Sequence, residues 1–174
     1  GSDCTLSNGN LEIAYGSSGT RKSTMGTIGM SSGKWYCEFS YASGSSPTPI
    51  VGLSSKASAT DMPNYPGYNA YGWGYDNSGL KYTNAVSASY GATWTTNDII
   101  GVAFDADAGT LSFYKNGVSQ GTAYTGLTSG PYYFAVGDGG GVATYTGWIN
   151  FGQRPFAYTP PSGYKSLCTY NLPT

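Results

Sequence analysis

The chain has 174 residues, of which only 10% are charged, and its formal net charge is −1. This length predicts one domain with a sizeable core, and the near-neutral charge argues against a nucleic-acid partner, because phosphate binding needs a basic surface. With 39% apolar residues, including 17 Tyr, the chain is too aromatic for disorder, and its 27 Gly indicate many turns between short strands. We therefore expect an all-β fold.

Two further absences narrow the class of protein. No stretch approaches the roughly 18 consecutive apolar residues of a membrane-spanning helix, so we expect no membrane insertion. Gly1 and Ser2 are typical of a remnant left by tag removal, and we assign residues 3–174 to a single domain.

The three cysteines lack the spacing of metal ligands, and the chain contains no His, so we expect neither a metal nor a cofactor. Cys37 alternates with large apolar residues and is expected to be buried. Cys4 and Cys168 lie near the two ends of the chain. They would form a disulfide if the first and last strands were neighbours, and otherwise remain free thiols, which is the alternative we favour.

In chain order, residues 5–11 predict a short edge strand beside a turn. Residues 33–40 alternate between two sets of side chains, which predicts a strand buried on one face only. Residues 50–53 form a short apolar strand. A hairpin is expected from residues 72–75 and 80–83, joined by a turn rich in Asp, Asn and Gly.

The strongest local pattern lies in the centre of the chain. The continuous apolar run at 99–104 predicts a strand covered on both faces. After a turn at 105–109 the chain returns as a second strand at 110–114. Asn116 and Gly117 are the favoured pair for a tight hairpin turn, because both central residues need a positive φ.

Three more strands are expected at 132–136, 148–151 and 166–170, the last at an edge. Their spacing, with glycine-rich turns, predicts a two-sheet antiparallel β-sandwich. Three tryptophans in strand-like contexts are expected in its core: Trp35, Trp94 and Trp148.

Several of these segments resemble the SPRY domain family. The similar segments, in the order of that family, are GKWYCEF (33–39), NDIIGVAFD (97–105) followed by GTLSFYKNG (109–117), and WINFGQ (148–153). The resemblance extends over about residues 5–173. It implies a bent, concanavalin-like jelly-roll sandwich that recognises partners through loops at one end and has no catalytic residues.

The terminal segments are similar to SPRY domains of bacteriophage structural and tail proteins. These segments are TLSNGNL (5–11), FGQRPF (151–156) and YTPPSGYKSLC (158–168). The likeness implies a virion-associated module, on a tail fibre or another exposed surface of the phage particle.

The residues themselves argue against an enzyme. The absence of His excludes Ser-His-Asp and Cys-His chemistry, and the two Glu residues of the chain are too far apart in sequence to form a glycosidase strand motif. Asp105 and Asp107 flank a turn, and we expect them to bond turn amides instead of calcium, because the ligand series of a calcium loop is incomplete. The glycine-rich segment 137–141 lacks the ending of a phosphate loop and is expected to be a mobile loop.

The segment 61–73 is the candidate recognition loop, because Tyr side chains among Gly, Asn and Pro offer large contact areas at low entropic cost. Aromatic faces also stack on sugar rings. We expect Tyr65 and Tyr68, beside a Pro-Gly turn, to be exposed, whereas Trp73 packs either in the core or outside it. The predicted ligand-binding residues are Tyr65, Tyr68, Asn69, Tyr71 and, from the loop 137–147, Tyr145.

The predicted function is a non-catalytic recognition module that binds a protein or a surface glycan through these loops. The alternative is a structural role, in which the domain decorates or oligomerises a fibre and binds no host molecule. Oligomer formation through the parent protein is compatible with either.

Overall fold

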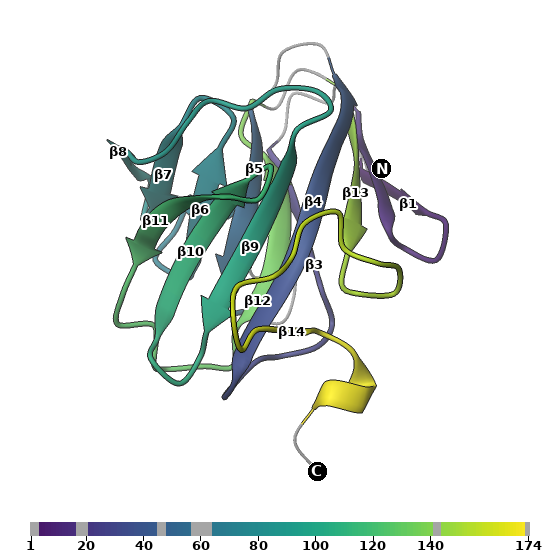
Figure 1. Ribbon diagram of the computed structural model, residues 1–174. Helices are drawn as coiled ribbons and strands as arrows, with labels where there is room; N and C mark the ends of the chain where they lie inside the picture. Colours follow the sequence, from purple (N-terminus) through teal and green to yellow (C-terminus); the bar gives the residue numbers. More distant parts are fainter. Residues whose placement is uncertain (1–3, 17–20, 45–47, 57–63, 141–143, 173–174) are drawn as a thin grey trace.

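A computed structural model describes residues 4–16, 21–44, 48–56, 64–140 and 144–172, and within these the chain forms two β-sheets packed face to face (Figure 1). In the eight-stranded sheet the order is β1 (Cys4–Ser7), β2 (Glu12–Tyr15), β13 (Tyr145–Asn150), β4 (Lys34–Gly44), β9 (Ile99–Asp105), β10 (Thr110–Lys115) and β11 (Val118–Tyr124), with β14 (Lys165–Ser166) parallel to β4. The six-stranded sheet has the order β3 (Lys22–Met25), β12 (Tyr133–Asp138), β5 (Pro49–Ser54), β6 (Gly72–Asp76), β7 (Leu80–Thr83) and β8 (Val86–Ser89). The expected two-sheet sandwich is therefore confirmed.

The core lies between the two sheets and is rich in aromatic rings. Phe39, Tyr41 and Trp94 meet edge to face, and the Tyr145 ring completes this cluster. Such pairs stabilise a fold by about 0.5–1.5 kcal/mol beyond the area that they bury. Trp35 and Trp94 are buried, as expected.

The central strand β4 is buried on both faces, and the expectation of one buried face is wrong. Residues 151–164, the C-terminal strap, cross the outer face of the eight-stranded sheet in front of β4 and β9 (Figure 1). The Glu38 carboxylate accepts hydrogen bonds from the main-chain N–H groups of Ala157 and Tyr158, both at 2.9 Å. The Phe156 ring packs edge to face on Tyr36, with centroids 5.0 Å apart. The polar-looking face of this strand is thus covered by a segment more than a hundred residues away in sequence.

The predicted central hairpin is confirmed. Strand β9 is buried along its length apart from its first residue, as its apolar run indicates. Asn116 and Gly117 have φ of 49° and 78°, and the pairing of Lys115 with Val118 makes them the two-residue turn.

At the other end of β9, the Asp105 carboxylate accepts hydrogen bonds from the N–H groups of Asp107 and Ala108, and its second oxygen lies 3.1 Å from Lys34 Nζ. Asp107 accepts a hydrogen bond from Gly33 N–H. Asp105 therefore bonds amides of its own turn, as predicted, whereas Asp107 bonds an amide before β4. In the described part of the chain, no three His, Cys, Asp or Glu side chains are grouped to hold a metal ion.

Strands β2, β3, β8 and β11 were not expected, since the predicted N-terminal strand at 5–11 is β1 followed by a turn, and the predicted C-terminal strand at 166–170 is shorter than expected. Only β14 is a strand there, and Thr169–Asn171 form a 3₁₀ turn. Cys4 and Cys168 are free thiols, and Cys37 is buried. No helix among the described residues is long and apolar enough to cross a membrane.

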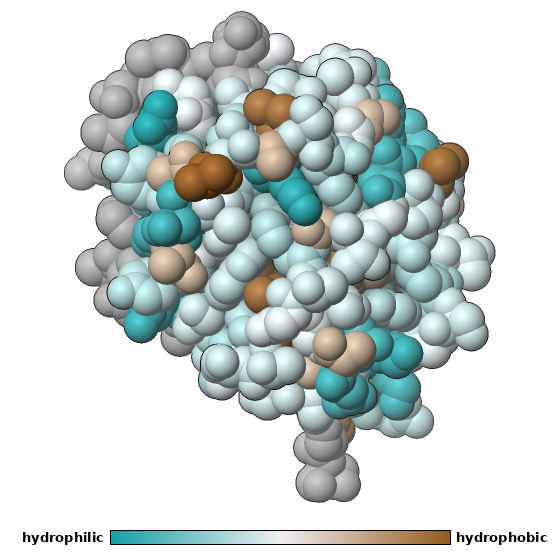
Figure 2. Space-filling model, turned by 90° about the vertical axis from the view of Figure 1, so that its left-hand side faces the viewer, coloured by the Kyte–Doolittle hydropathy of each residue, from teal (hydrophilic) through white to brown (hydrophobic). Residues whose placement is uncertain are grey.

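The sandwich has two open sides, because each sheet ends in an edge strand on either side. On one side β8 and β11 are the edges, and on the other side they are β1 and β3. Figure 2 faces the β8/β11 side and shows a mostly pale and teal surface on which brown side chains are separated from one another.

Candidate functional site

The described part of the predicted recognition loop, residues 64–71, lies on the outer face of the six-stranded sheet. Two glycines let its backbone approach the strands. A Cβ atom at Gly137 of β12 would lie 2.6 Å from Pro66 and 2.9 Å from the Tyr65 Cα, and one at Gly74 of β6 would meet the Pro66 carbonyl oxygen. No real side chain fits such spaces, so these positions require glycine. Residues 61–63 of the predicted loop lie outside the described residues.

Main-chain hydrogen bonds hold this loop on the turn between β7 and β8. Ala85 N–H donates to the Gly67 carbonyl at 2.9 Å, and Asn84 N–H donates to the Asn69 carbonyl at 3.2 Å. The Asn69 side-chain oxygen accepts from Tyr71 N–H at 3.1 Å, which is the local turn geometry that Asn favours. The loop is therefore fixed by backbone contacts and presents its side chains from a set path.

Tyr65 is buried, so the expectation that it is exposed is wrong. Only 8% of it is accessible, because its ring packs edge to face against Tyr68 and Tyr82 and the Arg21 guanidinium lies 5.5 Å from its centroid. Burial raises the pKa of Tyr65 above its ordinary value, and the positive charge of Arg21 opposes this. Burial also raises the pKa of Tyr82 to about 12, with a further contribution from the Asp76 carboxylate. Tyr65 thus supports the loop from below.

Tyr68 and Tyr71 are the exposed aromatic residues of the loop, with 40% and 45% of their surfaces accessible. The Lys56 ammonium group lies 4.4 Å from the centroid of the Tyr71 ring, within the range of a cation–π contact. These side chains form the candidate recognition surface, which we define as Lys56, Tyr68, Asn69 and Tyr71.

Tyr145 does not belong to this surface. It is the first residue of β13 and is 1% exposed, with its ring stacked on Tyr15 and its hydroxyl donating to the Gly137 carbonyl at 2.8 Å. The expectation that it lies in an accessible loop is wrong, because the strand begins earlier than the glycine-rich sequence indicated. Residues 141–143 of that loop lie outside the described residues.

The structure also shows how far Trp148 and Trp73 are buried. Trp148 is half-buried on the outer face of the eight-stranded sheet, where Arg154 lies over its ring at 5.8 Å, so its expected place in the core is wrong. Trp73, for which both alternatives were open, is half-buried and packs edge to face against Tyr132.

Sequence reasoning missed Lys56 and Arg21. Both residues lie next to strands, and nothing in their spacing relates them to the Tyr-rich segment. The contact of a cation with a Tyr ring arises only after the loop has folded over the sheet. The glycines of β6 and β12 were the available signal for that path.

The chemistry of the candidate surface is that of recognition. Two exposed phenol rings, an ammonium group and an Asn carboxamide offer apolar area together with hydrogen-bond donors and acceptors. None of the pKa shifts at this loop produces a nucleophile or a base that works near neutral pH, because burial raises the tyrosine values.

Comparison with known proteins identifies the relatives of the chain. The SPRY domain family model matches residues 34–154. E3 ubiquitin-protein ligase RKP of Arabidopsis thaliana is 34% identical over 99 residues, which is 55% of this chain and 7% of that protein. Ran-binding protein 9 of Mus musculus is 31% identical over 111 residues, 62% of this chain and 16% of that protein.

A solved structure gives the same fold. The crystal structure of the SPRY domain of human HERC1 superimposes with a TM-score of 0.73 at 22% identity, covering 88% of this chain and 96% of that one. The chain spans 7 to 18% of the length of the curated relatives named above and of Ran-binding protein 10 of Danio rerio. The family model covers most of the chain, and the chain therefore belongs to the SPRY domain family.

Proposed function

We propose that the domain is a non-catalytic module that binds a partner protein through the candidate recognition surface. SPRY domains are protein-interaction modules, and two of the relatives are by name Ran-binding proteins. The observation that carries the proposal is the pairing of exposed Tyr68 and Tyr71 with a loop backbone held in place by hydrogen bonds.

The physical argument is one of preorganisation. A surface whose backbone is already fixed loses little conformational entropy on binding. Tyr residues are enriched among the side chains that dominate binding energy at interfaces. Lys56, held near the Tyr71 ring, adds a positive charge that favours an acidic group on the partner.

The experiment selects ligands for the purified domain from a displayed random-peptide library and measures their affinities by titration calorimetry. We expect Tyr68→Ala and Tyr71→Ala each to weaken binding about 30-fold, the equivalent of about 2 kcal/mol. We expect both variants to melt like the wild type, because exposed side chains contribute little to stability. Tyr65→Ala should lower the melting temperature instead.

Val118→Ala is the matched control, because this exposed apolar residue lies on β11, away from the loop. A glycan array run in parallel tests the second ligand class expected from the sequence. Binding to a glycan and to no peptide would contradict the proposal. So would peptide affinities that the two Tyr variants leave unchanged.

The setting on a bacteriophage particle stays a prediction that rests on the resemblance of the terminal segments. The relatives named above come from a plant, a fish and a mouse. Attachment of the labelled domain to bacterial cells is the measurement that tests it. A stable oligomer in solution that buries Tyr68 and Tyr71 would favour the alternative structural role.

A further inference from the structure

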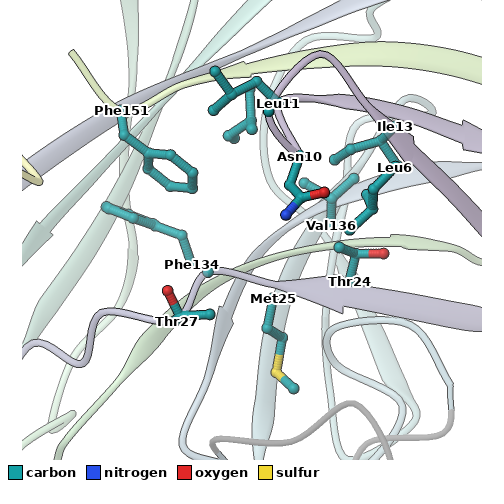
Figure 3. A pocket seen from close by; sticks show the side chains of 13 residues that line it. Leu6, Asn10, Leu11, Ile13, Thr24, Met25, Thr27, Phe134, Val136 and Phe151 are labelled. Carbon is teal, nitrogen blue, oxygen red and sulfur yellow. The ribbon is translucent and has the colours of Figure 1, made fainter. Parts of the chain in front are cut away.

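The β1/β3 side of the sandwich contains an apolar pocket that opens between the two sheets (Figure 3). Its volume is about 270 Å³, and residues of β1, β2 and β13 from one sheet and of β3 and β12 from the other line it. Its apolar lining includes Leu11, Ile13, Phe134, Val136, Ile149 and Phe151. Phe134 and Phe151 lie on one side of the opening and Leu11 and Ile13 on the other (Figure 3).

Polar contacts between the sheets close one end of this side. The Tyr15 hydroxyl lies 2.9 Å from the Val136 carbonyl oxygen and 3.0 Å from Thr24 Oγ1. Cys4 Sγ lies 3.0 Å from the same Thr24 atom. Side chains of β1, β2 and β3 therefore cover the gap between the sheets at this end.

The other end of this side stays open because two residues that line the pocket there have no side chain. Gly9 lies in the turn between β1 and β2, and Gly26 directly follows β3. A Cβ atom at Gly9 would meet nothing within 4 Å, and one at Gly26 would lie 3.4 Å from the Phe151 ring. The pocket is thus a space that these positions leave unfilled.

The size and charge of the pocket limit the class of ligand that it accepts. About 150 Å³ of apolar cavity holds a benzene molecule, and pockets for drug-sized ligands measure about 300–1,000 Å³. A volume of 270 Å³ therefore suits a compact molecule of one or two rings. Among the described residues that line the pocket, none is Asp, Glu, Lys or Arg. A charged group would lose its water there without gaining a partner, which is costly, so the pocket favours a neutral ligand.

One polar side chain points into this apolar space. The Asn10 carboxamide is directed into the pocket (Figure 3), and it has no hydrogen-bond partner among the described residues. The other Asn of the same turn is held, because Asn8 Nδ2 donates to the Glu12 carboxylate at 2.7 Å. A carboxamide offers both donors and an acceptor. Asn10 is therefore available to bond one polar group of a ligand.

We propose that this pocket is a binding site for a small neutral molecule with a compact apolar ring body and one hydrogen-bonding group. The ring body lies between the sheets, against Phe134 and Phe151, and its polar group bonds to the Asn10 carboxamide. Burial of the apolar body supplies the affinity, and the single polar contact fixes the orientation. The inference does not depend on the candidate recognition surface, which lies on the outer face of the six-stranded sheet.

The test titrates 2-naphthol, a neutral two-ring molecule with one hydroxyl group, into the ¹⁵N-labelled domain. Amide chemical shifts report the site and the affinity, and we expect saturable binding with the largest shifts at Gly9, Asn10 and Gly26. Nuclear Overhauser contacts should place the naphthol protons against the rings of Phe134 and Phe151.

Two analogues test the expected chemistry of the ligand. The anion 2-naphthoate carries the same rings with a carboxylate in place of the hydroxyl group, and it should bind at least about 10-fold more weakly because its charge is desolvated. Phenol has one ring fewer, buries less apolar surface, and should bind severalfold more weakly than 2-naphthol.

Two variants make the result specific. Gly26→Leu directs a side chain toward the Phe151 ring without backbone strain, since Gly26 is not among the glycines with positive φ, and should weaken 2-naphthol at least about 10-fold. Asn10→Gly removes the carboxamide at a position with φ of 65°, which glycine adopts readily. It should weaken 2-naphthol severalfold and leave the binding of naphthalene, which has no hydroxyl group, unchanged. Val118→Leu, on the opposite side, is the control and should bind like the wild type, and thermal melts check that each variant is folded.

Four results would overturn the proposal. The first is a titration in which 2-naphthol causes no saturable shifts, or shifts that centre on Tyr68 and Tyr71 instead. The second is equal affinity for 2-naphthol and 2-naphthoate. The third is binding that a folded Gly26→Leu variant leaves unchanged. The fourth is a dimer in analytical ultracentrifugation that Gly26→Leu dissociates, which would show that the occupant is a second copy of this chain.

Discussion

The gap between the two sheets is covered by different contacts on the β8/β11 side and on the β1/β3 side. On the β8/β11 side, long polar side chains reach across the gap to main-chain carbonyls. Tyr124 Oη lies 2.8 Å from the Tyr82 carbonyl and 3.1 Å from that of Gly74, and Lys81 Nζ donates to the Ala123 carbonyl at 2.7 Å. Tyr90 donates to the Gly121 carbonyl at 2.5 Å. Each contact joins the sheets or braces β11.

On the β1/β3 side, the bridge formed by Tyr15 and Thr24 covers only one end, and apolar side chains line the rest. Partial exposure of an apolar lining lowers the stability that burial would give, by about 25 cal/mol for each Å² left in water. The comparison shows that one side of the sandwich is stabilised by polar contacts between the sheets, whereas the other keeps an accessible apolar lining. The following predictions test that difference.

The largest effect should come from Tyr145→Ala, at the closed end of the β1/β3 side. The buried ring stacks on Tyr15 with centroids 4.8 Å apart, so its loss leaves a cavity and should lower the free energy of unfolding by about 3–5 kcal/mol. Tyr145→Phe keeps the ring, removes one hydrogen bond to Gly137, and should cost about 1 kcal/mol. Urea unfolding measures both, and wild-type stability of the Ala variant would place Tyr145 outside the core.

Gly117→Val should have the next largest effect, in the hairpin that forms the β8/β11 side. Its φ of 78° strains a β-branched residue, and a Cβ atom there would lie 2.7 Å from the Tyr158 ring. We expect a loss of about 1–3 kcal/mol from such strain.

Gly121→Val is the matched control in the same hairpin, because Gly121 has φ of 84° but open space around it. Thermal melts of both variants should show a smaller loss of stability for Gly121→Val than for Gly117→Val. Equal losses would mean that backbone strain alone acts, and that contact of the hairpin with the C-terminal strap contributes nothing.

Tyr124→Phe and Tyr15→Phe remove one bridging hydroxyl from each side. Each should lower the free energy of unfolding by about 0.5–1.5 kcal/mol, since a buried carbonyl (Val136) or a partly buried one (Tyr82) loses a hydrogen-bond donor. The double variant should show the sum, because sites on opposite sides share no contacts. A clear departure from additivity in denaturant unfolding would show that the two sides are coupled.

The last prediction concerns the pH dependence of stability on the β8/β11 side. Burial raises the pKa of Tyr90 to about 12, although its hydrogen bond from Phe113 N–H opposes the shift. A tyrosine whose pKa is raised on folding stabilises the fold fully below its unfolded value of 10.0 and loses this contribution as pH rises toward 12. Thermal melts between pH 9 and 12 should therefore fall, and less steeply in Tyr90→Phe. The same slope in both proteins would exclude Tyr90 as the cause.

The sequence predicted those parts of the fold whose determinants are local. The hairpin at 99–117 follows from an apolar run and an Asn-Gly pair, and both are visible in a few consecutive residues. Strands β3 and β8 have the sequences KSTM and VSAS, which are short and carry little apolar pattern, so only pairing with their neighbours makes them strands. The covered outer face of β4 depends on Glu38 meeting the distant C-terminal strap, which no local pattern contains.

The aromatic loop of the candidate site was predictable from the sequence, but which of its tyrosines are exposed was not. Tyr composition correctly located an aromatic loop, and Tyr68 is exposed as expected. It could not separate Tyr68 from Tyr65, because the two differ only in which of them lies beneath the loop, against Tyr82. Whether these residues bind a partner stays a prediction.

The glycines beneath the loop make the path of its backbone independent of the side chains that the loop exposes. The path of the loop backbone is determined by Gly74 and Gly137 beneath it and by the hydrogen bonds at Gly67 and Asn69. The outward side chains at positions 68 and 71 do not determine this path. Substitutions at these two positions change the shape and charge of the surface while the main chain keeps its course. We therefore expect that residues 68 and 71 can be exchanged to alter the contact surface of the loop without redesigning the fold.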